Sequence, residues 1–184
     1  MLSIHVDDAT YYNEDTETFA HVKGADLQLE HSLISLSRWE EKWHIPFLAT
    51  DNKTDEQIRD YVRCMTVTKN IDQQVYDYMP TSVLKEILDY IENPMTATWF
   101  NDENEKRKGA PRRKEIVTSE IIYYWMITLN IPVQFERWHL NRLLTLIRVL
   151  NIKNAPSKKM NKRDILANNR KLNAARRAKH KSKG

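Results

Sequence analysis

Apolar and polar residues alternate along the N-terminal part of the chain. Leu2, Ile4 and Val6 occupy every second position, and residues 27–29 repeat the alternation. A period of two places successive side chains on opposite faces of a β-strand. A short apolar segment at 19–22 lies between them, and Asp, Asn, Thr and Gly residues typical of turns separate the three segments. The pattern predicts a small antiparallel sheet or hairpin at the N-terminus.

The spacing of the apolar residues becomes helical from Leu33 onward. Thr54 and Gln57 match a capping box, in which each side chain bonds the backbone amide of the other residue. About five helices are therefore expected after the strands. The helical spacing covers the stretches from Leu33 to the break at Ile45-Pro46, from Thr54 to Met65, from Asp72 to Met79, from Thr81 or Ser82 to the break at Pro94, from Thr118 or Ser119 to Leu129, and a last stretch near 134–150.

Residues 118–150 are expected to form a central hairpin of two helices. Ile131 and Pro132 interrupt the helical spacing, and so short a connection implies that the two helices pack antiparallel. The predicted fold class is α+β and mostly helical. The predicted inward faces are Ile121, Ile122, Trp125, Met126 and Leu129 on the first helix and Leu140, Leu143, Leu144, Ile147 and Leu150 on the second, with Leu84, Ile87, Leu88 and Ile91 on the helix that ends at Pro94.

Formal charge is divided unevenly along the 184 residues. Residues 151–184 contain 12 Lys or Arg and one acid, which gives +11, whereas the whole chain has 29 basic and 25 acidic residues. Residues 1–150 therefore hold 17 basic and 24 acidic residues, or −7. We predict a mostly helical globular domain over 1–150 and a basic C-terminal tail over 151–184, in which Asn161 can cap a helix that runs to about Lys179. Such a tail is attracted to anionic surfaces, either nucleic acid or an acidic protein.

Composition excludes several classes of protein. With only 3 glycines, a sandwich, a barrel or a phosphate-binding loop is disfavoured. Cys64 is the only cysteine, so the chain can form neither an intramolecular disulfide nor a cysteine-based zinc cage. The N-terminus lacks the basic start and apolar run of a signal peptide. The longest uncharged apolar-rich stretch, 121–132, is shorter than the roughly 20 residues that span a bilayer. We expect a soluble protein of a reducing compartment, without membrane contact.

Candidate catalytic and metal-binding residues are few. Glu136 and His139 form a Glu-x-x-His pair, but di-iron bundles need this motif twice with two further glutamates, and no second copy occurs. A histidine at the surface or at an interface is the alternative for His139. The remaining candidates match no known spacing of ligands or nucleophiles. We therefore expect no catalytic residue, no metal and no cofactor. The candidates considered were His5, His21, His31 and His44, with Cys64 or a serine as nucleophile.

Bulky aromatic residues are candidates for a protein-binding surface. One face of each hairpin helix is assigned to the core, and Tyr123, Tyr124 and Trp138 lie partly outside those faces. Tyr and Trp residues concentrate at protein interfaces. Core packing is the alternative, and we prefer it for Trp125. Residues 95–100 are predicted to be a strand or an extended linker. The charged loop that follows, Asn101–Lys114, carries Lys106, Arg107, Lys108, Arg112, Arg113 and Lys114, a cluster able to complement an acidic partner.

The tail supplies a second group of candidate binding residues. Runs of Lys and Arg bind phosphates without reading sequence, and the tail has no aromatic residue that could stack on a base. Weak nucleic-acid binding and docking on an acidic protein both remain open. The residues concerned are Lys158, Lys159, Lys162, Arg163, Arg170, Lys171, Arg176 and Arg177.

Several stretches of the chain resemble a known family. They are Leu29 to Glu40, Pro94-Met95-Thr96-Ala97-Thr98-Trp99-Phe100, Thr118 to Met126, Trp138-His139-Leu140-Asn141-Arg142-Leu143-Leu144-Thr145-Leu146-Ile147-Arg148, and Lys158-Lys159-Met160. Together they are similar to the tail assembly chaperones of long-tailed (siphovirus-type) bacteriophages, and the likeness runs over most of residues 26–177. None of these stretches is a motif with a chemical mechanism of its own.

The resemblance implies a non-enzymatic protein in the cytoplasm of an infected bacterium, absent from the mature virion. Such a protein binds the tape-measure protein, keeps it soluble and helps tail tube subunits polymerise around it. Contact with the tube protein and self-association are further implied partners, and the family often has a longer form made by frameshifting. Two other functions remain open from the residues: a small phage protein that binds nucleic acid through its tail, for packaging or regulation, and a structural head or tail component.

Overall fold

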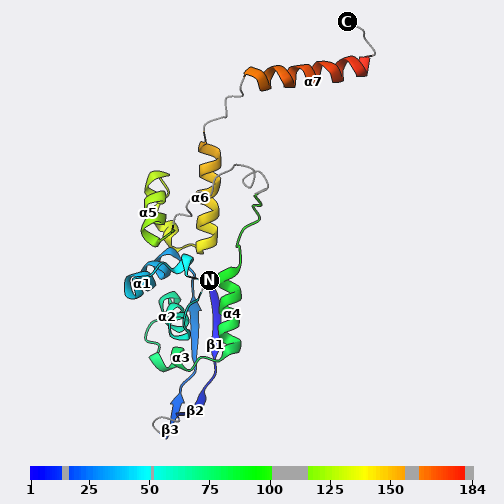
Figure 1. Ribbon diagram of the computed structural model, residues 1–184. Coiled ribbons are helices and arrows are strands. Elements are labelled where there is room, and N and C mark those ends of the chain that lie inside the picture. The colour runs from blue at the N-terminus through cyan, green and yellow to red at the C-terminus, as the bar shows by residue number, and fades with distance from the viewer. Residues whose placement is uncertain (14–16, 51, 101–115, 156–161, 181–184) are drawn as a thin grey trace. The chain divides into compact units, whose positions relative to one another are not determined.

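The computed structural model describes residues 1–13, 17–50, 52–100, 116–155 and 162–180. The chain divides into two compact units, Met1–Leu150 and Asn151–Gly184, and each is described by itself. Four short strands come first, and six α-helices follow before the last helix, α7 (Lys162–His180), of the second unit (Figure 1). The mostly helical α+β fold predicted from the sequence is confirmed, and each of the six stretches with helical spacing contains one described α-helix.

The strands form two antiparallel pairs. Ile4 lies opposite Leu27 in the first pair, and the side chains of Ile4, Val6, Leu27 and Leu29 are buried, as the alternation predicts. Val67 N donates to Gln28 O at 2.8 Å, so the chain that follows the second helix lies along this pair. The first pair joins β1 (Leu2–Val6) to β4 (Ala25–Leu29), and the second joins β2 (Ala9–Asn13) to β3 (Thr18–Val22).

The first helices begin and end where their capping residues place them. Thr54 Oγ1 accepts a hydrogen bond from Gln57 N at 3.3 Å and Gln57 Oε1 accepts one from Thr54 N at 3.0 Å, which confirms the capping box. Asp72 caps the next helix, as predicted. The elements are α1 (Leu33–Trp43), the 3-10 turn η1 (Phe47–Ala49), α2 (Asp55–Met65), α3 (Gln73–Asp77) and α4 (Thr81–Glu92).

The core of the first unit lies between the strands and these helices. Trp39 of α1 is fully buried and its indole Nε1 donates to Gln57 O at 2.9 Å. Phe47 stacks on Tyr61 with ring centroids 3.9 Å apart. The helix α4 lies alongside β1 (Figure 1). Residues 95–100, predicted to be a strand or a linker, form no strand.

Both helices of the predicted hairpin over 118–150 are present, as α5 (Ser119–Thr128) and α6 (Leu140–Asn154). The helix α5 also packs against α1, a contact that the spacing does not predict. A buried carboxylate fixes this arrangement, because Glu40 accepts hydrogen bonds from Ser119 N at 2.7 Å and from Phe47 N at 2.9 Å. Asn130, with φ of 53°, and then Pro132 end the helical stretch.

The second helix of that stretch begins later than the sequence indicates. Val133–Arg137 form a 3-10 turn, η3, and Trp138 is extended. Leu140 N donates to the His31 carbonyl at 2.7 Å, and the His139 carbonyl accepts from Leu143 N at 3.1 Å, so α6 starts at Leu140. A contact with a distant part of the chain therefore sets this boundary, and the apolar spacing carries no sign of it.

The predicted inward faces are correct only in part. Ile122 and Met126 of α5 and Leu140, Leu143 and Ile147 of α6 are buried. Ile87 of α4 is buried as well, whereas Leu88 is exposed. The other predicted residues pack at the margin or stay half-buried, namely Ile121, Trp125, Leu129, Leu144, Leu150, Leu84 and Ile91.

Candidate protein-binding surface

The helix α5 exposes apolar side chains in a region without charge. No charged residue occurs between Glu120 and Glu136. Within this region Tyr124 is 63% exposed, Ile127 76% and Val133 66%, and we call these three residues the α5 surface. Tyr124 and Ile127 are three positions apart and so neighbours on one helix face. A helix that is apolar all round is normally buried. Its outer face therefore lacks a partner among the described residues.

Tyr123, also predicted at the binding surface, is held by the fold. It is half-buried, and its hydroxyl donates to Glu136 Oε2 at 3.0 Å. Burial, and then the Glu136 carboxylate beside it, raise the pKa of Tyr123 to about 12. The bond joins α5 to η3, so Tyr123 fixes the two elements that carry the α5 surface.

Trp138, the third aromatic prediction, forms a layered contact. Its ring stacks on Phe135 at 4.0 Å, with an angle of 14° between the planes. The Arg142 guanidinium lies over the same ring, 4.2 Å from its centroid. Trp138 remains half-buried, so its packing supports both the core interpretation and a role at the margin of a contact surface.

Two exposed residues were missed by the sequence analysis. The apolar spacing assigns Ile127 to neither face of its helix, and Trp99, at 92% exposed, enters only in the stretch 94–100 that resembles the family. The absence of charged residues around Ile127 is the sequence feature that could have indicated an exposed apolar surface there. Trp99 lies next to the predicted basic loop. The loop residues Arg112, Arg113 and Lys114 lie outside the described residues.

The helix α7 carries the basic residues of the tail. Its exposed apolar side chains are Leu166 and Leu172. The helix matches the range predicted for it, although Asn161 is outside the described residues. Of the candidate binding residues, Arg163, Arg170, Lys171, Arg176 and Arg177 are exposed, Lys162 lies in the helix, and Lys158 and Lys159 are outside the described residues.

Two buried histidines meet where β4, α4 and α6 come together. The rings of His31 and His139 lie 5.0 Å apart, edge to face. His31 Nδ1 shares a hydrogen bond of 2.6 Å with the Tyr61 hydroxyl, and His139 Nε2 bonds the Tyr90 carbonyl at 3.1 Å. Burial, reinforced by the neighbouring His139, lowers the pKa of His31 to about 3. Burial also lowers the pKa of His139. The neutral rings join the N-terminal strands to the start of α6.

Apart from the contact between His31 and His139, the candidate metal and catalytic residues have separate partners. Glu136 bonds Tyr123 while His139 faces Tyr90, so the Glu-x-x-His pair does not converge. Burial raises the pKa of the Cys64 thiol, which disfavours the thiolate. Of the other candidate histidines, His5 bonds Asp26 and His21 bonds Thr10, and His44 ends α1 with φ of 55°. In the part of the chain that the structure describes, no three His, Cys, Asp or Glu side chains gather as a metal site would require.

The described helices also include none that is both long and apolar enough to cross a membrane. Comparison of the chain with protein-family models, with curated proteins and with solved structures found no match.

Proposed function

We propose that this protein is a tail assembly chaperone of a long-tailed bacteriophage. It binds the tape-measure protein in the cytoplasm of the infected cell, assists polymerisation of the tail tube around it, and is absent from the finished virion. It acts by binding alone, without catalysis. The resemblance of residues 26–177 to that family motivates the proposal, and the exposed α5 surface is the observation that carries it.

The α5 surface suits a client made of long helices. Apolar side chains on one helix face can pack against the apolar stripe of an amphipathic helix, as in other helix-in-groove contacts. A region without charge adds no electrostatic preference of its own, so it accepts successive segments of one long client. The exposed Trp99 would add aromatic contact area of the kind that dominates interface energies.

Co-expression with a tape-measure protein tests the proposal. Tyr124→Ala combined with Ile127→Ala should weaken binding of the tape-measure protein by about 30-fold or more, because truncating interface residues costs on the order of 1–2 kcal/mol each. Much less tape-measure protein should then co-purify. The melting temperature should stay unchanged, since both side chains are exposed. Trp138→Ala, measured in parallel, shows whether the stacked aromatic belongs to the same surface.

Leu166→Ala combined with Leu172→Ala is the matched control, because it removes two exposed apolar side chains from α7 instead. If the α5 variant retains full binding while this control loses it, the client contact lies on the tail. If the wild-type chain fails to retain any tape-measure protein, the proposed function is wrong.

Nucleic-acid binding is a second candidate, favoured by the exposed basic side chains of α7. Phosphate contacts make such binding strongly dependent on salt. Duplex DNA binding that falls steeply between about 50 and 200 mM salt, together with no affinity for the tape-measure protein, would favour this function over the chaperone.

A further inference from the structure

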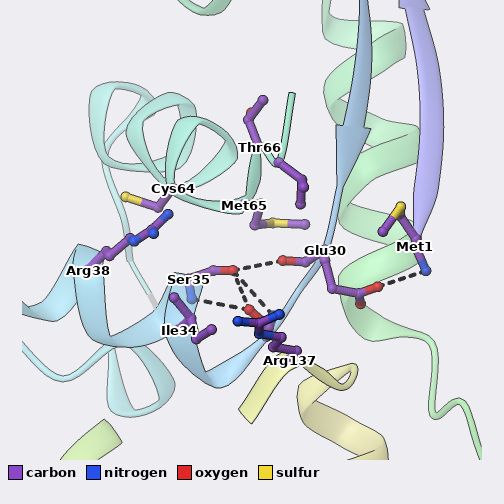
Figure 2. A pocket seen from close by; sticks show the side chains of 11 residues that line it. Met1, Glu30, Ile34, Ser35, Arg38, Cys64, Met65, Thr66 and Arg137 are labelled. Atoms are coloured by element: carbon purple, nitrogen blue, oxygen red, sulfur yellow. Dashed lines mark hydrogen bonds and ion pairs between the residues drawn. The ribbon is translucent and has the colours of Figure 1, made fainter. Parts of the chain in front are cut away.

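An open pocket lies between α1 and the chain that follows α2 (Figure 2). Its volume is about 420 Å³. Ile34, Met65 and Val67 provide apolar lining, and Arg38 and Arg137 line it as well. Both arginines are exposed, and among the described residues neither guanidinium has a hydrogen bond or an ion pair.

The pocket's other polar groups are already bonded within the fold. Ser35 Oγ donates to the Glu30 carbonyl at 2.7 Å and contacts Ser32 Oγ at 2.8 Å. Thr66 Oγ1 donates to the Val62 carbonyl at 2.9 Å. These hydroxyls therefore have their hydrogen-bonding capacity largely used. The two guanidinium groups remain available to donate hydrogen bonds to a ligand. Because they are positively charged and only donate, they favour an anion.

The charge of the pocket favours an anion. Glu30 lines the pocket, and its carboxylate is paired with the Met1 ammonium at 2.8 Å and accepts from the Tyr90 hydroxyl at 2.8 Å. With that pair neutral overall, Arg38 and Arg137 leave a local charge of +2 on a body whose formal charge is −7. The choice between a carboxylate and a phosphate therefore depends on the apolar lining, against which a carboxylate with an apolar neighbour can pack. The apolar lining has no counterpart on a phosphate.

We infer that this pocket binds an acidic side chain of a protein partner together with an adjacent apolar residue. The carboxylate is attracted by the positive charge of Arg38 and Arg137, which line the pocket at separate points (Figure 2), and the apolar neighbour packs on Ile34, Met65 and Val67. This inference rests on the proposed function for the nature of the partner, a protein client. The pocket would be a second contact with the client, and this contact is charged whereas the α5 surface is not. A charged contact fixes the orientation of the client, which the uncharged α5 surface does not.

The test uses blocked dipeptides and the full-length, isotope-labelled chain. N-acetyl-Leu-Glu-amide should shift the backbone amide resonances of residues 34–38 and 65–67 in a saturable way. N-acetyl-Leu-Gln-amide, which has the same shape without the charge, should bind about tenfold more weakly, because a hydrogen bond to a charged group contributes roughly 1.5 kcal/mol or more. Inorganic phosphate at the same concentration should not compete.

Variants locate the site. Arg38→Gln and Arg137→Gln should each weaken Leu-Glu binding by about tenfold with the rest of the spectrum unchanged, since both side chains are exposed. Lys85→Gln is the matched control: it removes the same charge from an exposed position of α4 and should change nothing. Equal binding of the two dipeptides, shifts at other residues, competition by phosphate, or absence of any titration would each overturn the inference.

The Arg38→Gln and Arg137→Gln variants are then co-expressed with the tape-measure protein, as described above for the α5 surface. If the wild type binds the dipeptide at the pocket but does not bind the tape-measure protein, the pocket inference is supported and the chaperone function is rejected. Tape-measure binding with no dipeptide titration would reject the pocket alone. The two failures are therefore distinguishable.

Discussion

His31 and His139 are each buried beside the other, and the cost of charging them makes the stability of the fold depend on pH. In the unfolded chain the pKa of a histidine is 6.5, whereas burial lowers the pKa of His31 in the folded protein to about 3. Between these values the unfolded chain binds the additional proton. The free energy of unfolding is therefore unaffected by His31 above 6.5, and it decreases as the pH falls below that value. His139, with its pKa lowered, acts in the same direction.

We expect the free energy of unfolding to be lower at pH 5 than at pH 8 by on the order of 2 kcal/mol from His31. Urea denaturation at the two pH values measures the difference. His31→Gln should reduce the difference, although it also lowers stability at both pH values by disturbing the bond to Tyr61. His5→Gln is the control: His5 is exposed, and its hydrogen bond to Asp26 raises its pKa instead. A stability that is flat from pH 8 to pH 5 would contradict the buried, neutral pair.

At this scale, the sequence predicts what depends on near neighbours. The Thr54 cap and the alternation of Ile4 and Val6 depend on spacings of two or three residues, and both are present. The contact between His31 and His139 joins residues far apart along the chain, and no local pattern contains it. The two arginines of the pocket are a similar case, because Arg38 belongs to α1 and Arg137 to η3.

Among the elements, α5 shows where apolar spacing misleads. Its sequence is apolar on all sides, so the spacing cannot say which face meets the core. The prediction placed Trp125 inward and left Ile127 unassigned, yet Ile127 is exposed and Trp125 half-buried. The element is positioned by a polar contact, the bond from Ser119 N to the Glu40 carboxylate. The short break between α5 and α6 suggests only their packing on each other, whereas the Glu40 contact also joins α5 to α1.

This contact gives the element-scale prediction. Glu40→Ala should lower the free energy of unfolding by roughly 2–5 kcal/mol, because the buried amides of Phe47 and Ser119 each lose their acceptor. Glu41→Ala is the matched control. Glu41 is exposed, follows Glu40 and makes no such bond to a described residue, so its removal should change the free energy of unfolding by less than about 0.5 kcal/mol. Chemical denaturation measures both variants. Equal losses, or no loss from Glu40→Ala, would show that other contacts position α5.

For the whole molecule, charge and structure divide the chain at similar places. The first unit ends at Leu150, and the 34 residues after it carry +11 while the body carries −7. The described side chains of α7 are exposed, and its apolar residues are too few to form a core. A basic segment of this kind contributes to long-range attraction and little to the folding of the body.

Deleting residues 157–184 should accordingly leave a body that unfolds cooperatively, with a melting temperature within a few degrees of the full chain. The same deletion should abolish any weak affinity for DNA, because the remaining charge is strongly negative and repels phosphate. Calorimetry and a salt series of DNA binding measure the two effects on one pair of proteins. Loss of the cooperative transition would mean that the second unit helps to hold the body together. DNA binding that survives the deletion would place the phosphate contacts on the body, where the guanidinium groups of Arg38 and Arg137 would be the first residues to test.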